Sequence, residues 1–188
     1  MKQQFMKMAL GILVSSAVIT SCKKDKVEEP NNEELITTIL VKLTPVGGGP
    51  VLNFQVEDLD GNGGNAPVAQ EIVLAPNKVY TAEMMIQDKT KTPVGDVSAE
   101  VRAEADDHQF YFTPNAAVEL SVTNLDKDSK NYPLGLTSTW TTGAASTGKI
   151  FILLKHKPGI KGASDPATLG ETDIDTQASF NGFDVKIQ

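Results

Sequence analysis

Apolar and polar residues alternate in short runs along most of this 188-residue chain, from residue 35 onward. In the run 52–57, for example, every second residue is apolar. Because successive side chains of a β-strand point to opposite faces, a period of two is typical of strands with one buried face. Glycine- and proline-containing segments separate the runs, as expected of turns. We expect eight or nine short strands in an all-β fold, an antiparallel β-sandwich of the Ig-like or Greek-key type.

Local patterns refine this prediction. The runs at 35–43 and 52–57 flank a segment with three glycines between two prolines, which favours a β-hairpin. The run at 150–154 is apolar on both faces and is therefore expected at the centre of a sheet. One short helix is predicted near 96–107, where an N-cap residue precedes apolar residues at helical spacing. The Asn-Gly pair at 181–182 predicts either a hairpin turn or a bulge in one long terminal strand.

The start of the chain carries a separate signal. Lys2 and Lys7 precede an apolar run at 8–19, a combination typical of a secretory signal peptide. The run has about half of the ~20 residues that a transmembrane helix needs. It ends in the sequence ITSC, and small residues before a lone cysteine resemble a lipobox, at which bacterial lipoproteins are cleaved and lipidated. We expect residues 1–21 to be removed and Cys22 to carry a lipid anchor.

This anchor predicts the domain organisation and the location. Residues 22–34 are charged and have little to bury, so we expect a flexible acidic tether. A single β-sandwich domain is expected over 35–188. The lipid would attach the protein to a Gram-negative outer membrane, facing the periplasm or the cell surface. Cys22 is the only cysteine, so the domain must fold without disulfides and offers no thiolate for chemistry.

The charge of the chain limits its partners. Removal of the leader takes away two lysines and no acid, which changes the formal net charge from -7 to -9. Nucleic-acid binders present basic faces to the phosphates, so an acidic domain is not expected to bind nucleic acid. Cations, or an uncharged protein or glycan surface, are the ligands that this charge favours.

Several stretches resemble small Gram-negative lipoproteins described as type 1 periplasmic binding fold superfamily proteins. They are SCKKD, EELITTILVKLTP, DLDGNGGNAPV, DDHQFYF, PLGLTSTWTTGAAS and GETDID, and they cover most of the mature chain. The resemblance implies a location in the cell envelope. The name also implies solute binding by paired, doubly wound α/β lobes, whereas the strand pattern of this chain predicts an all-β domain.

The segment after the second run resembles half of a calcium-binding loop. Asp58, Asp60 and Asn62 are spaced like ligands 1, 3 and 5 of an EF-hand, with a glycine next. The twelfth position, which needs a bidentate glutamate, is Ala69, and Glu71 would replace it only if the loop curls. The pattern predicts either a Ca²⁺ site, the one cofactor that the sequence suggests, or an ordinary polar loop between strands.

Other polar residues give weaker signals. Closely spaced acids favour either a solvated surface or a bound cation, and they lie at positions 126, 128, 171, 173 and 175. The only two histidines, His108 and His156, lie on separate segments, which favours surface or helix-end roles over a transition-metal site. Trp140, with Tyr132 nearby, predicts either a core residue or an exposed platform for stacking sugars.

These patterns favour a lipid-anchored, non-catalytic binding or adhesion module of the cell envelope, with calcium as an option for stabilising its loops. One alternative is a glycan- or polymer-associated accessory protein of an outer-membrane uptake system, which would use Trp140. The other is a carboxylate-dependent hydrolase, which requires two acids about 5 to 9 Å apart. No motif for an activated nucleophile supports an enzyme, so we expect no catalytic residues.

Replacing Cys22 with serine tests the lipoprotein prediction. We expect mass spectrometry of the native protein to find a chain that begins at an acylated Cys22, and we expect the variant to carry no acyl group. A native chain that keeps its initial methionine and has no acyl group would contradict the prediction.

Overall fold

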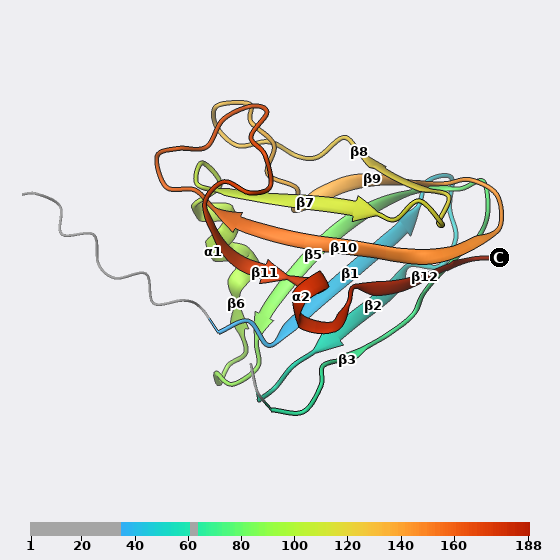
Figure 1. Cartoon of the computed structure of the whole chain (residues 1–188), viewed down its shortest axis with the longest axis horizontal. Helices are drawn as coiled ribbons and strands as arrows, with labels where there is room; N and C mark the ends of the chain where they lie inside the picture. Colours follow the sequence, from blue (N-terminus) through green and yellow to red (C-terminus); the bar gives the residue numbers. More distant parts are fainter. Residues whose placement is uncertain (1–34, 61–63) are drawn as a thin grey trace, which may run out of the picture. The chain divides into compact units, whose positions relative to one another are not determined.

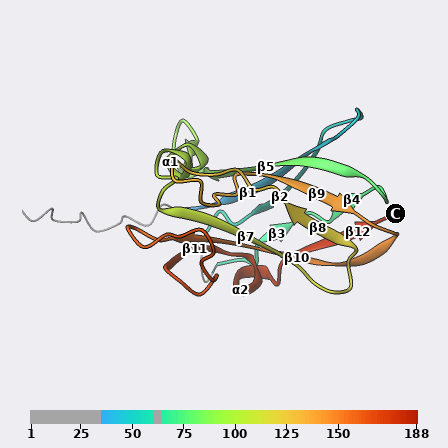
Figure 2. The same cartoon turned by 90° about the horizontal axis from the view of Figure 1, so that it is seen from above.

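The computed structural model describes residues 35–60 and 64–188, whose strands form two stacked sheets (Figures 1 and 2). The predicted signal peptide, Cys22, the tether and Asn62 lie outside these residues. The first sheet has the order β3-β2-β1-β5-β9-β8, with β6 paired to β5. Its strands are β1 (Thr38–Pro45), β2 (Leu52–Glu57), β3 (Val68–Ala69), β5 (Val79–Asp88), β6 (Gly95–Asp96), β8 (Leu120–Thr123) and β9 (Thr137–Thr142).

The second sheet is built around its longest strand, β10 (Ser146–His156). Strand β7 pairs along one edge of β10, and β11 and β12 pair one after the other along the opposite edge. The outer strand β4 pairs with β12 in parallel. These four strands are β4 (Ile72–Leu74), β7 (His108–Pro114), β11 (Glu171–Asp175) and β12 (Phe183–Ile187).

The all-β sandwich predicted from the alternation is confirmed. Strands β1 and β2 form the expected antiparallel hairpin, with Val41 opposite Phe54, and β10 lies centrally as expected. Two details differ from the expectation. The structure has twelve strands in the described residues, and two of them, β3 and β6, contain two residues each, too few to show a period. The parallel β4–β12 pair makes the second sheet mixed rather than wholly antiparallel.

Two short helices, α1 (Val97–Ala103) and α2 (Thr176–Phe180), accompany the sheets. Helix α1 is the predicted one, and the side chain of its N-cap Asp96 accepts a hydrogen bond from the Ala99 amide at 3.2 Å. Neither helix is long and apolar enough to cross a lipid bilayer, within the part of the chain that the structure describes.

Helix α2 explains the Asn-Gly pair. Asn181 caps the helix in the left-handed conformation with φ of 61°, and Gly182 follows with φ of 74°. The strands on either side, β11 and β12, pair with β10 rather than with each other, so the hairpin prediction is wrong. The bulge prediction comes closer, because β11 and β12 both pair with β10 as one long terminal strand would. However, helix α2, and not a single extra residue, separates the two strands. A Cβ at Gly182 would lie 2.6 Å from the Phe151 ring, which adds a steric need for glycine.

The core lies between the two sheets and is filled by the alternating apolar residues. Val41 and Leu43 of β1 and Ile150 and Ile152 of β10 are fully buried. Trp140 of β9 joins them and is fully buried as well. Burial of one such side chain stabilises the fold by roughly 1.5–3 kcal/mol. The two sheets therefore hold each other through one continuous apolar layer.

Two of the acids for which the sequence predicted either a solvated surface or a bound cation instead bond to other parts of the protein. Asp126 accepts hydrogen bonds from the amides of Gly135 and Thr137 at 2.8 and 3.0 Å. Asp128 accepts bonds from two amides of its own loop, and its Oδ2 lies 2.8 Å from Nζ of Lys161, both side chains being almost fully buried. This ion pair joins the loop after β8 to the loop after β10.

Replacing Asp128 with alanine should lower the free energy of unfolding by about 3–5 kcal/mol, because Lys161 is left buried without its partner. Urea denaturation measures the change. The matched control is Asp184→Ala, which removes an exposed ion pair with Lys149 and should cost less than ~1 kcal/mol. Equal losses in the two variants would contradict a structural role for the buried pair.

The same pair predicts a pH dependence. Burial opposes ionisation of Asp128, but hydrogen bonding to Lys161 and to the Tyr132 amide outweighs it, so the pKa lies below the usual 3.8. A carboxyl whose pKa is lower in the folded state stabilises the fold above its unfolded pKa and loses this effect as the pH falls through the folded pKa. The difference between wild type and Asp128→Ala should therefore shrink below about pH 4.

Candidate functional site

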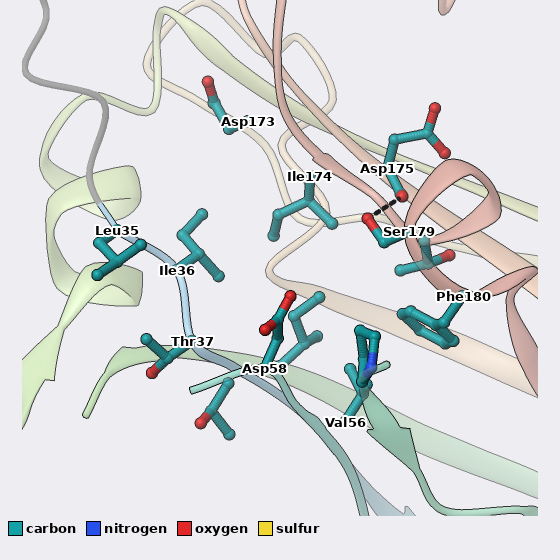
Figure 3. A pocket seen from close by; sticks show the side chains of 14 residues that line it. Leu35, Ile36, Thr37, Val56, Asp58, Asp173, Ile174, Asp175, Ser179 and Phe180 are labelled. Carbon is teal, nitrogen blue, oxygen red and sulfur yellow. Dashed lines mark hydrogen bonds between the residues drawn. The ribbon is translucent and has the colours of Figure 1, made fainter. Parts of the chain in front are cut away.

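A pocket of about 240 Å³ opens between the two sheets, where the first sheet begins and β11 leads into α2 (Figure 3). Ile36 and Ile39 come from the entry to β1 and from β1 itself, and Val56 comes from β2. Ile174 of β11 and Phe180 of α2 line the opposite side. The volume lies just below the ~300–1,000 Å³ of pockets for drug-sized molecules, so it suits a small ligand.

The pocket lies where the chain forms α2, and not a strand, at the edge of β10 between β11 and β12. Where a continuous strand would pack against the first sheet, the chain turns into α2, which starts at Thr176. Phe180 then packs edge-on against Phe183, with ring centroids 5.2 Å apart. These contacts keep the helix against its own sheet. The space beside it is left open between Ile174 and Ile36.

Three acids line this pocket, and they have different surroundings. Asp58 follows β2 and points into the space between the sheets in Figure 3. Asp175 is the N-cap of α2, and its Oδ1 accepts bonds from the amides of Gln177 and Ala178 at 2.9 and 3.0 Å. Asp173 points away from the pocket centre, and its Oδ2 lies 3.7 Å from Nε2 of His108. Of the three acids, Asp58 is the one whose carboxylate points into the pocket.

Asp173 owes its position to an irregularity in the β10–β11 pairing. Leu154 pairs with Ile174 and Lys155 with Thr172, so Asp173 is left over as an extra residue. Such bulges redirect a side chain. Oδ2 of Asp173 is buried and meets no hydrogen-bond donor among the described residues. Burial raises the pKa of Asp173 above its usual 3.8, although His108 acts in the opposite direction.

The two histidines come together, which the sequence did not predict. His108 of β7 lies opposite His156 of β10, and their rings stack with centroids 4.7 Å apart. His108 is only 8% exposed, so the surface role is wrong for this residue. The alternative helix-end role fits, because Nδ1 of His108 lies 3.0 Å from the carbonyl oxygen of the C-cap residue of α1. Glu104, the C-cap of α1, lies beside them. The signal that could have found this cluster is the pairing register of β7 and β10, which needs the two strands to be aligned.

Among the described residues, the predicted calcium ligands do not come together in one cluster of three. Oδ2 of Asp60 accepts bonds from the amide and the side chain of Asn65 at 3.0 and 2.7 Å, and these bonds lower its pKa. Glu71 is exposed between β3 and β4 and forms no three-ligand cluster with Asp58 and Asp60 in the part of the chain described. Calcium binding therefore stays a prediction without a geometric site.

Of the two roles predicted for Trp140, the core residue is the one that the structure shows, and the exposed sugar platform is wrong. The indole ring is fully buried, its Nε1 donates a hydrogen bond to Ser138 at 3.1 Å, and Phe112 packs edge-on against it. Trp140 sits on β9, whose alternation turns it toward the core, and the threonines beside it occupy the other face. Its role is core packing, and the glycan hypothesis loses the residue that supported it.

Comparisons with known protein families, with curated proteins and with solved structures find no match. The fold and the site define the class: a two-sheet, all-β sandwich with a small pocket between the sheets, lined by apolar and polar residues in equal number. The resemblance to Gram-negative lipoproteins stays a prediction, and the α/β lobes that its name implies are not the fold of the described residues.

Replacing Trp140 with alanine should lower the free energy of unfolding by about 3–5 kcal/mol, the range for truncating a large core aromatic. The control is Val68→Ala on β3, where the valine is 74% exposed and the change should stay within about 0.5 kcal/mol. Chemical denaturation followed by circular dichroism compares the two. A Trp140 variant as stable as wild type would show that the ring is not part of the core.

Proposed function

We propose that this protein is a lipid-anchored, non-catalytic binding module of the bacterial cell envelope, and that its ligand is a small amphipathic cation held between the sheets. The observation that carries the proposal is the pocket itself. It combines apolar walls, formed by Ile36, Ile174 and Phe180 among others, with the carboxylate of Asp58. Small-molecule sites typically pair an apolar lining with few polar groups that orient the ligand.

The charge of the ligand follows from the acids at the pocket. Asp58, Asp173 and Asp175 give this region a negative potential, and the chain as a whole is acidic. A cationic group gains from that potential, whereas an anion is repelled. The apolar walls favour a hydrocarbon body on the same molecule, because its burial removes apolar surface from water. An alkylammonium ion has both features.

The predicted lipid anchor would keep the pocket close to a membrane. The 13 residues 22–34, which lead from Cys22 to Leu35, span at most about 45 Å when fully extended. Leu35 and Ile36, where the described chain begins, line the pocket. A lipid on Cys22 would therefore hold the pocket within this distance of a membrane surface, which suits a ligand that is itself found at membranes.

A hydrolase receives less support from the same pocket. Catalysis by paired carboxylates needs two acids that face one substrate bond. Asp175 is occupied as the N-cap of α2, and in Figure 3 the Asp173 carboxylate is turned away from Asp58. Binding requires no such pair, so a binding module accounts better for the arrangement.

Displacement of the fluorescent dye N-phenyl-1-naphthylamine tests the pocket. We expect octylammonium to displace the dye from the wild-type protein more strongly than octanoate does. Asp58→Asn keeps the shape and removes the charge, and it should weaken octylammonium binding about tenfold, or ~1.4 kcal/mol. Asp184→Asn, which removes an exposed acid of β12, is the matched control and should change nothing.

A second variant tests the location. Ser179 is exposed at the pocket and lies beside Phe180, so Ser179→Trp should obstruct the opening without disturbing the core. It should weaken the binding of the dye and the binding of octylammonium alike. No dye binding by the wild type, or equal binding by wild type, Ser179→Trp and Asp58→Asn, would contradict the proposal.

A further inference from the structure

The end of α1, the start of β7 and the end of β10 lie together at one end of the second sheet (Figure 1). Four side chains that can bind metals or protons gather there. They are Glu104 at the end of α1, His108 on β7, His156 on β10 and Asp173 on β11. In the sequence these residues are up to 69 positions apart, counted from Glu104 to Asp173. The β7–β10–β11 pairing brings them to one end of the second sheet.

Three of them lie close enough to share one ligand. One possible ligand atom from each of Glu104, His108 and His156 lies within 4.8 Å of the others. Oε2 of Glu104 is 4.0 Å from Nδ1 of His108. The two imidazole rings stack at 4.7 Å because their residues are directly opposite in the β7–β10 ladder. Two imidazoles and one carboxylate are a frequent ligand set for zinc and for other divalent transition metals.

The hydrogen bonds of His108 supply an independent observation. Its Nδ1 lies 3.0 Å from the carbonyl oxygen of Glu104, which can only accept, so Nδ1 carries the proton in this arrangement. Neutral His108 then turns an unprotonated Nε2 toward Oδ2 of Asp173 at 3.7 Å. That oxygen is buried and has no donor among the described residues. When Asp173 is ionised, two acceptors therefore face each other, and this arrangement costs free energy.

We propose that Glu104, His108 and His156 bind one divalent transition-metal ion, such as Zn²⁺, and that Asp173 is the positioning residue of His108. The metal takes Nδ1 of His108, and the proton of Nδ1 passes to Nε2. The new Nε2–H then donates to Oδ2 of Asp173, so the buried oxygen gains its missing donor. A carboxylate that receives the second N–H of a metal-bound histidine is a recurrent support of such sites.

The two imidazole planes differ by only 16°, so the lone pairs of their nitrogens run nearly parallel, and His156 must turn out of the stack to share a metal with His108. Zinc bonds of about 2.0–2.1 Å place tetrahedral ligands about 3.3 Å apart, so the 4.8 Å spread must close by about 1.5 Å. The Glu104 side chain is 63% exposed, and His156 is partly exposed, so both can rotate at the surface. His108, which is nearly buried, keeps its place. Water would supply the fourth ligand.

Equilibrium dialysis of the detergent-solubilised full chain against Zn²⁺ tests this site. All samples carry Cys22→Ser, so that they contain no cysteine and do not differ in lipidation. We expect one equivalent of bound zinc, and loss of stoichiometric binding in Glu104→Gln and His156→Ala. Glu100→Gln, one turn earlier on the exposed side of α1, is the matched control and should bind like the parent. Asp173→Asn should bind about 10- to 100-fold more weakly.

Nitrogen-15 NMR of the imidazoles gives a readout that does not depend on affinity. The chain has only two histidines, and both belong to the proposed site, so every imidazole signal reports on it. Zinc should move the His108 proton from Nδ1 to Nε2, and Glu104→Gln should prevent the change. Absence of zinc binding by the parent, binding that Glu104→Gln and His156→Ala leave unchanged, or an unaltered tautomer with zinc bound would each overturn the proposal.

Discussion

The pairing of β10 along both of its edges is the constraint on which the rest of this structure depends. Strand β7 occupies one edge, and β11 and β12 share the other. Ile150, Ile152 and Leu154 meanwhile turn their side chains into the core against the first sheet. Both candidate sites follow from this arrangement. The pocket lies beside α2, between β11 and β12, and the histidine cluster lies where β7 begins and β10 ends.

Two irregularities on one edge of β10 create what is distinctive about the molecule. A regular strand from 171 to 187 would fill the edge completely and would leave neither a pocket nor a redirected side chain. The bulge leaves Asp173 outside the ladder and next to His108, and α2 opens the space that Ile174 and Phe180 line. Asn181 and Gly182 then return the chain to the ladder through two residues with positive φ. Local backbone irregularity, rather than an added domain, provides the candidate sites.

The fold was largely predictable from sequence because its signals are local. The alternation in β2, the N-cap of α1 and the doubly apolar centre of β10 each reflect the environment of a few neighbouring residues. The sequence reasoning failed where one pattern fits two local structures. Asn181-Gly182 suits a hairpin, a bulge or a helix C-cap equally, because each needs a residue in the left-handed region. For Trp140 the sequence left a core residue and an exposed platform open, because the exposed and buried faces of β9 differ only in the register of its alternation, and the core reading is the one that the structure bears out.

The sites were less predictable because they depend on which strands become neighbours. Nothing near His108 in the sequence indicates His156, and the two meet through a register that an isolated strand does not specify. The pocket likewise joins Asp58 to Ile174, which belong to different sheets. Motif spacing pointed instead to Asp58, Asp60 and Glu71, where local sequence imitates a calcium loop but the fold does not gather the three side chains.

The acids of this chain also show why acidic spacing alone was a weak guide. The sequence left a solvated surface or a bound cation open for these acids, yet the fold supplies many cationic and amide partners itself. Lys161 pairs with Asp128 inside the protein, and fully buried Lys157, whose pKa burial lowers, lies 3.5 Å from Asp165. Backbone amides at helix starts and in loops donate hydrogen bonds to Asp96, Asp126 and Asp175.

Asp173 differs from all of these, because its buried oxygen faces an imidazole nitrogen instead of a lysine or an amide. A buried carboxylate oxygen without a donor is costly, and folded proteins keep such groups rarely. The same residue borders the pocket on one side and the histidine cluster on the other. A hydrogen-bond donor to Asp173 would therefore affect both sites. A metal ion at the histidines would change the charge that a ligand in the pocket meets.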